Sequence, residues 1–399
     1  MLRGITLISK FILLLFIARY LTPADLGVWG LMNMTLGIGV LFLGMDFHAF
    51  NTREILAVEQ LSFVPYLRDQ LVFHGLMSLV VFPLATLAFI INVIPWHYAL
   101  WFYGLLVLEH LSQESMRVLI TLSRPTLANV VVFFRNGAWV YVVVTILYFT
   151  PDQRSLHVIW GGWMVGVLIS ILVSGFALKN LPWGILRENP VNWFWIRGGF
   201  KVALPFFSSS LAFLGIQNMD RYFLKLYFDE SYVGIYTFYL SISNVIYVAI
   251  YTGIIMILYP KLVASYQHCD YTEYNVLMKK MTWGIIGALL VLIGLAYVLI
   301  DPILQLVDKQ PYTANKGIFA YTLAFTAILT LSNIPHYALY VRHRDKGIIF
   351  STYVAFLVAL IANMLLVPEY GLQGAGAATL IGMCVIFILK GLILVNWKF

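Results

Sequence analysis

The charged side chains between residues 210 and 225 are the clearest group in the sequence that could do chemistry. Arg221 and Lys225 lie on one helix face, with Asp220 beside it. Their guanidinium and ammonium donors suit an anionic ligand such as phosphate or pyrophosphate. An internal Asp220–Arg221 ion pair, with Lys225 reaching toward water, is the alternative interpretation. The residues of this face are spaced by seven, four and four positions, as one side of a helix requires: Ser210, Gln217, Arg221 and Lys225.

Other ionisable residues also interrupt apolar runs, where they are costly unless they face water or a partner. Lys10 and Arg135 each lie well inside such a run, so we expect both to face a polar cavity. His110, Glu114 and Arg117 are spaced by four and three residues and share one helix face. That face suits a vestibule or a gate, and a polar stripe satisfied by its own members is the alternative. Further candidates of the same kind are Asp46, His48, Glu109 and His336.

Motifs of soluble catalytic chemistry are missing from the sequence. It contains no GxxxxGK[ST] phosphate-binding loop, no HExxH metal pair and no GxSxG elbow. Its two cysteines, Cys269 and Cys384, fall in a loop and in the last apolar run, which predicts neither a disulfide nor a metal site. We therefore expect a transporter rather than an enzyme, without a cofactor or a bound metal.

The composition indicates which kind of element positions these residues. Of the 399 residues, 61% are hydrophobic and only 11% are charged, whereas a soluble domain carries about 25% charged residues. A soluble fold of this size could not hide so much apolar surface from water. The net charge of +7 comes from dispersed basic residues without a recognition motif, so nucleic acid is not an expected partner. The natural solvent of this chain is lipid.

Apolar runs long enough to cross a bilayer recur along the whole chain. A membrane-spanning helix needs about 20 such residues, and the sequence predicts an all-α polytopic membrane protein with about twelve transmembrane helices. The first run is followed by eleven others, so we interpret it as a membrane helix and not as a signal peptide. The predicted spans are 2–21, 27–47, 71–92, 97–120, 125–148, 156–178, 203–226, 233–258, 281–300, 315–340, 346–367 and 372–394.

Basic residues concentrate in every second loop. Under the positive-inside rule these loops face the cytoplasm, and so do both termini. The loops expected outside hold only Arg154, Lys309 and Lys316 away from helix ends. The inner loops hold Arg53, Arg68, Arg117, Arg124, Lys179, Arg187, Arg197, Lys201, Lys261, Lys279, Lys280, Arg342, Arg344 and Lys346, while Arg3 and Lys398 lie at the two ends.

An internal repeat divides the chain into halves. The segment LTPADLGVWGL at 21–31 is similar to FDESYVGIYTF at 228–238, at an offset of 207, with Gly27 and Gly234 in the same place. WGGWMVG at 160–166 and QGAGAAT at 373–379 match more weakly, and chance similarity of short apolar segments is the alternative. Six helices per copy give both halves one orientation and a pseudo-two-fold axis along the membrane normal. We expect a six-helix lobe at 1–180, a cytoplasmic interfacial linker at 181–202 and a second six-helix lobe at 203–399, around a central cavity.

Three segments also carry a family resemblance. ISKFILLLFIARYLTPADLGVWGL at 8–31 resembles the opening of the Wzx-type polysaccharide flippases, which belong to the superfamily of the lipid II flippases and MATE exporters. The segment 204–238 is similar to the seventh helix of that family and its following turn, and 368–380 to its final helix hairpin. The best-matching residues are Arg19, Tyr20, Leu21, Asp25 and Gly27, then Asp220, Arg221, Gly234, Ile235 and Tyr236.

The resemblance implies two six-helix lobes and alternating access. It also implies a flippase that moves undecaprenyl-pyrophosphate-linked oligosaccharide, such as an O-antigen unit for lipopolysaccharide biosynthesis, to the outer leaflet of the bacterial inner membrane. Expected partners are this lipid-linked substrate, membrane lipids, and the polysaccharide polymerase and chain-length machinery. Lys10, Arg135, Arg221 and Lys225 are our candidates for holding the pyrophosphate and anionic sugars, and the coupling or gating candidates are Asp220, Glu114, His110, Arg117 and Gln217.

Two other hypotheses stay open. The first is a MATE-type antiporter for small molecules, coupled to sodium or protons through Asp220 or Glu114. The second is a membrane-embedded polymerase or acyltransferase acting on the same glycolipids. An enzyme of that kind would need a large outer loop with catalytic side chains, and the spans predicted above leave no room for one.

Overall fold

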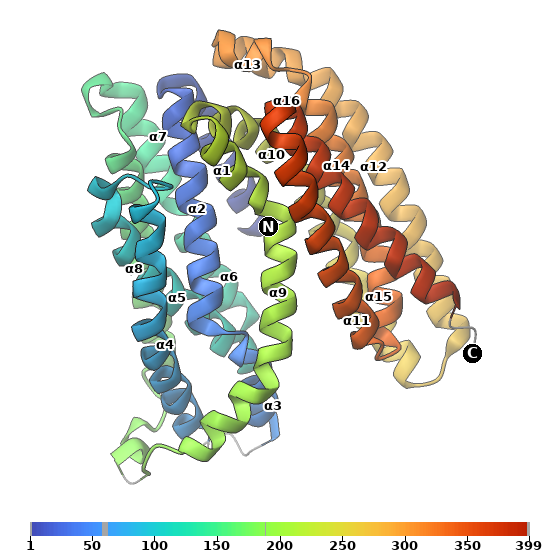
Figure 1. Ribbon diagram of the computed structural model, residues 1–399. Helices are drawn as coiled ribbons and strands as arrows, with labels where there is room; N and C mark the ends of the chain where they lie inside the picture. The colour runs from blue at the N-terminus through green and yellow to red at the C-terminus, as the bar shows by residue number, and fades with distance from the viewer. Residues whose placement is uncertain (1, 58–62, 188, 397–399) are drawn as a thin grey trace. The chain divides into compact units, whose positions relative to one another are not determined.

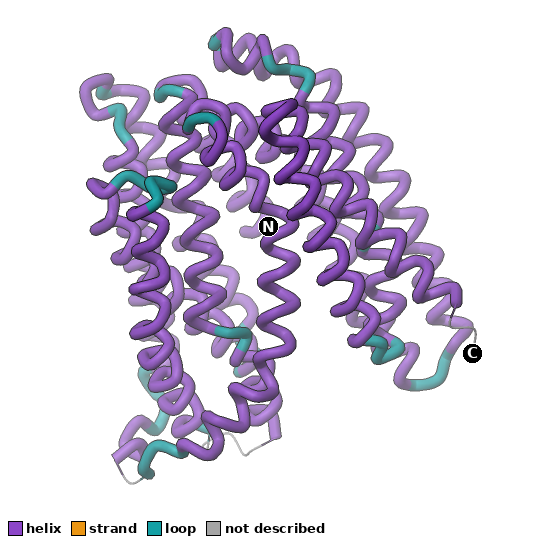
Figure 2. Tube along the Cα trace, viewed as in Figure 1, coloured by secondary structure: helices purple, strands orange, loops and turns teal. Residues whose placement is uncertain are grey.

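The structure is a computed structural model that describes residues 2–57, 63–187 and 189–396. Lys398, which we assigned to the cytoplasmic C-terminus, lies outside these residues. Within them the chain forms helices and short turns and contains no strand (Figure 2).

The helices follow one another with short connections (Figure 1). The first half contains α1 (Leu2–Tyr20), α2 (Pro23–Gly44), α3 (Phe47–Ala57), α4 (Val64–Ile90), α5 (Ala99–Thr121), α6 (Pro125–Phe133), α7 (Trp139–Phe149) and α8 (Leu156–Leu178). The second half contains α9 (Trp193–Tyr227), α10 (Glu230–Ile250), α11 (Met256–Gln267), α12 (Tyr271–Val307), α13 (Gln310–Ala314), α14 (Ile318–Leu331), α15 (Asn333–Val341) and α16 (Asp345–Asn396). Short 3₁₀ turns are η1 (Trp96–Tyr98), η3 (Pro151–Gln153) and η4 (Trp183–Arg187).

Nine helical stretches of the described chain are long and apolar enough to cross a membrane. The last of them, α16, is a hairpin: Gly371 has φ 54° and ψ −125°, and the two legs pack together where a Cβ on Gly382 would meet Ala359 and one on Gly347 would meet Ile393. Two more helices, α1 and α5, have 19 and 23 residues but carry three charged residues each. With these two and both legs of α16, the described residues contain the twelve spans that the sequence predicts.

Two spans contain a π-helical turn. The turn η2 (Phe134–Ala138) joins α6 to α7 and includes Arg135, and η5 (Tyr251–Ile255) joins α10 to α11. A π-helical turn adds a residue to the helix and is common at functional sites. Arg135 therefore lies at an irregular point of its span.

Contacts divide the chain into two units. Unit 1 contains the chain up to Phe16 together with Trp29–Leu211, and unit 2 contains Ile17–Val28 and the chain from Ala212 onward. The segment 17–28 packs within unit 2, where Arg19 Nη1 donates to the Leu306 carbonyl at 2.7 Å and Lys309 Nζ donates to the Leu21 carbonyl. The predicted first lobe, 1–180, includes this segment. Its packing with unit 2 depends on tertiary contacts, which the sequence does not reveal.

The two copies of the sequence repeat meet inside unit 2. A Cβ built on Gly27 would lie 1.8 Å from the Glu230 carbonyl oxygen, and a Cβ on Gly234 would lie 1.8 Å from the Pro23 carbonyl oxygen. Gly27 and Gly234 are 207 positions apart, as are Pro23 and Glu230, so each copy makes the same contact with the other. Reciprocal contacts of this kind arise where a two-fold axis passes between equivalent elements. The geometry supports the predicted repeat.

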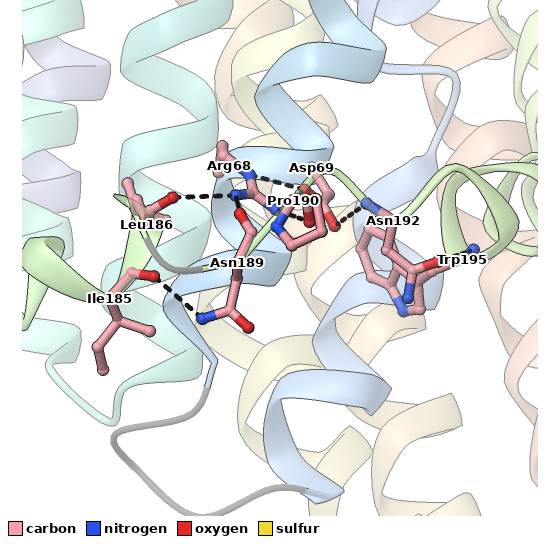
Figure 3. Close-up of polar contacts among 8 residues, drawn as sticks. All are labelled: Arg68, Asp69, Ile185, Leu186, Asn189, Pro190, Asn192 and Trp195. Atoms are coloured by element: carbon pink, nitrogen blue, oxygen red, sulfur yellow. Dashed lines mark hydrogen bonds and ion pairs between the residues drawn. The ribbon is translucent and has the colours of Figure 1, made fainter.

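The segment before α9 is fastened to α4 through one ion pair (Figure 3). Asp69 accepts from Arg68 at 2.6 Å and from the Asn192 backbone N–H at 3.2 Å. The Asn192 side chain in turn accepts from the Trp195 N–H at 2.9 Å and so caps α9. Helix α9 thus begins inside the predicted linker 181–202. The Arg68 guanidinium also donates to three linker carbonyls, those of Leu186, Asn189 and Pro190.

Candidate functional site

A polar pocket of about 330 Å³ lies inside unit 1. Its walls come from α1, α2, the α2–α3 turn, α5, η2 and α8, so the pocket is enclosed by helices that the sequence predicts to span the membrane. The lining residues are Lys10, Asn33, Leu36, Gly37, Val40, Leu41, Gly44, Asp46, Glu109, Gln113, Arg117, Arg135 and Trp163. Three of them are cationic and two carry carboxylates.

Lys10 is the cation of this pocket that lacks an internal partner. It lies eight residues into α1, roughly 12 Å along the helix at 1.5 Å per residue. Its side chain is exposed in the pocket, and no ion pair or hydrogen bond joins it to another described residue. An ammonium group at that depth is costly unless it meets water or an anion. The pocket therefore offers a positive charge that an anionic ligand could neutralise.

Arg135 is held at the pocket by α5. Its Nε lies 2.9 Å from Glu109 Oε2, and its Nη2 donates weakly to Gln113 Oε1 at 3.4 Å. Trp163 Nε1 donates to the other oxygen of Glu109 at 2.5 Å and so fixes the carboxylate. Nη1 of Arg135 is buried and has no hydrogen-bond partner among the described residues. The guanidinium thus keeps one buried donor that no described side chain satisfies.

A second polar network, centred on Glu114, adjoins the pocket through Arg117. Arg117 Nη1 lies 2.5 Å from Glu114 Oε1, and Gln70 Nε2 donates to Glu114 Oε2 at 2.7 Å. His110 packs edge-on against His74 with ring centroids 4.5 Å apart, and neither ring nitrogen of either residue has a hydrogen-bond partner in the described chain. The predicted face of His110, Glu114 and Arg117 is therefore assembled, but most of its charge is internally paired.

The α2–α3 turn contributes a titratable pair. His48 Nδ1 lies 3.9 Å from Asp46 Oδ1. Burial lowers the pKa of His48 to about 4, and the nearby charge of Arg117 acts in the same direction, while Asp46 opposes them. His48 is therefore neutral at pH 7 and leaves the Asp46 carboxylate at the pocket wall. The pocket is therefore of mixed charge.

Of the residues predicted on the seventh span, Ser210 lies in unit 1, whereas Gln217, Asp220, Arg221 and Lys225 lie in unit 2. Asp220 is fully buried and accepts from Thr379 Oγ1 at 2.8 Å and from the Arg221 backbone N–H at 2.7 Å. Arg221 Nη2 donates to the Gln217 carbonyl at 3.1 Å and to an Asn218 side chain at 2.9 Å. These contacts match the alternative interpretation of an internally satisfied group, and a role in ligand binding stays a prediction.

Lys225 pairs with Glu230 at the start of α10, a partner that neither interpretation of the sequence includes. Lys390 is a buried cation that sequence reasoning missed. Only 4% of Lys390 is exposed, and its Nζ lies 3.4 Å from Nδ1 of His336 on α15. A lysine near the end of a long apolar run suggests an interfacial anchor, and only the packing of α15 against α16 reveals its burial.

The sequence analysis also does not identify Gln113 and Trp163, which line the pocket of unit 1. Gln113 follows Glu109 by four residues, so a search for residues on the same helix face would find it.

Metal-binding clusters of three or more His, Cys, Asp or Glu residues do not occur in the described part of the chain.

The fold is similar to a solved structure, the inward-facing conformation of a multidrug resistance MATE family transporter of the MOP superfamily. The match has a TM-score of 0.74 at 14% sequence identity and covers 98% of this chain and 94% of that one. Neither protein-family models nor curated proteins give a match. The similarity confirms the predicted all-α polytopic membrane fold.

Proposed function

We propose that this chain is a flippase that moves undecaprenyl-pyrophosphate-linked polysaccharide repeat units from the inner to the outer leaflet of the bacterial inner membrane. The observation that carries the proposal is the unpaired ammonium of Lys10, in a membrane pocket that is also lined by Arg135, whose guanidinium keeps a buried, unsatisfied donor. Such a pair suits a phosphate diester, because charge-assisted hydrogen bonds from fixed donors replace water around the oxygens. The fold of a MATE transporter supports transport as the general activity.

Each side chain of the pocket has a distinct part in this proposal. Lys10 supplies the neutralising charge, and Arg135 supplies directed donors. Glu109 does not bind the anion but holds Arg135 in place, itself fixed by Trp163. At about 330 Å³ the pocket is near the lower end of ligand sites, which run from about 300 to 1,000 Å³. It would therefore hold the pyrophosphate and an adjoining sugar rather than a complete repeat unit.

Transport itself addresses a solvation problem. A sugar chain cannot cross hydrocarbon unaided, since each polar group that loses water without a new partner costs several kcal/mol. Alternating access would offer these groups a polar path while the polyprenyl tail stays in lipid. In this proposal both termini are cytoplasmic, and the polymerase and chain-length machinery receive the product outside.

A second candidate function is a MATE-like antiporter of small molecules coupled to an ion. The carboxylates at and beside the pocket, Asp46, Glu109 and Glu114, favour it, because they could bind a cationic substrate or a coupling ion. Glu109 and Glu114 are already paired with arginines. That pairing leaves Lys10 as the unpaired charge of the membrane helices at this pocket and favours an anionic substrate.

Complementation of a flippase-null strain tests the proposal. We expect Lys10→Met to abolish polysaccharide export at normal protein levels, and Lys10→Arg to retain part of it because the charge is kept. Lys280→Met is the matched control, since Lys280 is exposed on α12 and far from the pocket in sequence. Normal export by Lys10→Met would overturn the proposed site. Uptake of a cationic drug into vesicles, driven by an ion gradient and lost in Glu109→Gln, would favour the antiporter instead.

A further inference from the structure

A second polar pocket, of about 320 Å³, lies in unit 2. It forms where the α11–α12 turn meets the α15–α16 turn and the end of α16, all at the same end of this unit (Figure 1). The pocket is separate from the site proposed above, which lies wholly in unit 1. Its lining residues are Tyr266, Tyr271, Tyr274, Asn275, Leu339, Arg342, Arg344, Ile393 and Leu394.

The polar wall consists of two arginines and three tyrosines. Arg342 is within hydrogen-bonding reach of the Tyr274 hydroxyl, and no ion pair joins it to a carboxylate of the described chain. Tyr266 packs edge-on against Tyr271 and Tyr274, with ring centroids 5.7 and 5.4 Å apart. Tyr274 is buried, with 4% of its surface exposed, so this aromatic group is a fixed part of the wall. Guanidinium and phenol donors held in this way suit phosphate oxygens.

The opposite wall is apolar. Leu339 belongs to α15, while Ile393 and Leu394 belong to the second leg of α16. A free phosphate ion would gain nothing from these side chains, whereas the glycerol and first methylenes of a lipid would bury apolar surface against them. The pairing of basic and apolar walls points to an amphiphile with a phosphate headgroup.

Charges of both signs surround the pocket, and the carboxylates of Asp270, Glu273 and Asp345 are exposed in the same two turns. Lys346 is exposed directly beyond Arg344, and Lys279 and Lys280 are exposed farther along, about two turns into α12. These are residues that the charge pattern predicts on the cytoplasmic side. Anionic lipids give that surface a negative potential, and basic pockets between membrane helices bind their headgroups.

We infer that this pocket binds the phosphodiester headgroup of an anionic bilayer lipid such as phosphatidylglycerol. The headgroup phosphate lies against Arg342 and Arg344, and the start of the acyl region lies along Leu339 and Ile393. The site ties α15 and the second leg of α16 to the α11–α12 turn. This inference does not depend on the proposed transport activity, because none of its residues belongs to the unit 1 pocket.

Thermal unfolding of the purified full chain in a neutral detergent tests the inference. The melting temperature is followed while phosphatidylglycerol, phosphatidylcholine, undecaprenyl phosphate or inorganic phosphate is titrated in. We expect phosphatidylglycerol to raise it and phosphatidylcholine and inorganic phosphate to leave it unchanged. The double variant Arg342→Gln with Arg344→Gln should need about 25-fold more phosphatidylglycerol for the same effect, at roughly five-fold for each basic residue.

Two further variants keep the test decisive. Lys279→Gln with Lys280→Gln removes the same charge at the same end of unit 2 and should respond nearly as the unaltered chain does. Arg344→Gln alone changes an exposed side chain, so it remains informative if loss of Arg342 prevents folding. An unchanged response in the arginine variants, or an equal loss in the lysine variant, would overturn the site. Stabilisation by undecaprenyl phosphate alone would overturn the bilayer lipid as its ligand.

Discussion

Substitution of Gly27 by alanine should destabilise the chain, although alanine is the better helix former. Gly27 lies in the first turns of α2, and its Cβ would be 1.8 Å from the Glu230 carbonyl oxygen and 3.0 Å from the Gly234 nitrogen. Both are backbone atoms of α10, so no side chain can rotate away. The two helices must move apart by more than 1 Å to reach an ordinary contact distance of about 3.4 Å.

The magnitude follows from two opposing terms. Replacing a helical glycine by alanine stabilises a helix by about 1 kcal/mol. Overpacking a close contact costs about 1–3 kcal/mol, and more when the backbone itself must move. Since the obstacle here is backbone on both sides, we take the upper part of that range and expect a net loss of about 2 kcal/mol. Gly234→Ala should lose a similar amount, because the contact is reciprocal.

The measurement is the free energy or temperature of unfolding of the purified chain in one detergent. Gly37→Ala provides the control, since Gly37 lies on the same helix and has no heavy atom within 4 Å of its Cβ position. It should be neutral or slightly stabilising. If Gly27→Ala and Gly37→Ala unfold alike, the two repeats do not meet through these glycines and the symmetric contact is wrong.

Three other changes test separate parts of the structure. Glu109→Gln should destabilise the chain by about 3 kcal/mol by leaving Arg135 without its counter-charge, and a second change, Arg135→Gln, should recover part of that loss in thermal unfolding. Arg68→Gln removes the donor to three linker carbonyls, so hydrogen exchange in 181–192 should rise, whereas it should not rise in a variant of the exposed Arg53. His48 has a pKa of about 4 when folded against 6.5 when unfolded, so the unfolded chain takes up its proton first and stability falls as the pH drops from 6.5 toward 4. His48→Gln should flatten that part of the pH profile, and an unchanged profile would contradict the burial of this imidazole.

The spans were predictable because every helix that crosses a bilayer needs about 20 consecutive, mostly apolar residues. The run 156–178 coincides with α8, since the polar segment around Pro151 and Arg154 ends the apolar stretch sharply. Helix starts were harder to predict, as α2 begins at Pro23 and not at 27. Its start depends on a polar cap in which Thr22 and Asp25 exchange hydrogen bonds. Hydropathy does not register such caps.

The first turns of α9 and all of α3 also escaped prediction, for a related reason. Residues 193–202 mix tryptophans with Arg197 and Lys201, so they do not form a continuous apolar run, yet Asn192 caps them as helix. Helix α3 is short and carries polar residues on several sides. Apolar length alone finds membrane spans but overlooks helices that lie outside the hydrocarbon.

The site was predictable only one residue at a time. The cost of a cation in lipid singled out Lys10 and Arg135 separately, and the structure places both at one pocket. Their neighbour Glu109 could not be assigned to Arg135, because the pairing depends on how α5 packs against the span that contains η2. The extra residue of that π-helical turn also changes which face Arg135 occupies, and a regular helical period misses it.

Flipping of a purified lipid-linked oligosaccharide in proteoliposomes tests whether the unpaired ammonium of Lys10, inside the membrane, binds the phosphate of the substrate. If it does, the unaltered chain moves the lipid between leaflets, Lys10→Met slows movement at least ten-fold at equal protein density, and Lys10→Arg keeps a measurable rate. Equal rates for Lys10→Met and the unaltered chain would contradict this role of Lys10.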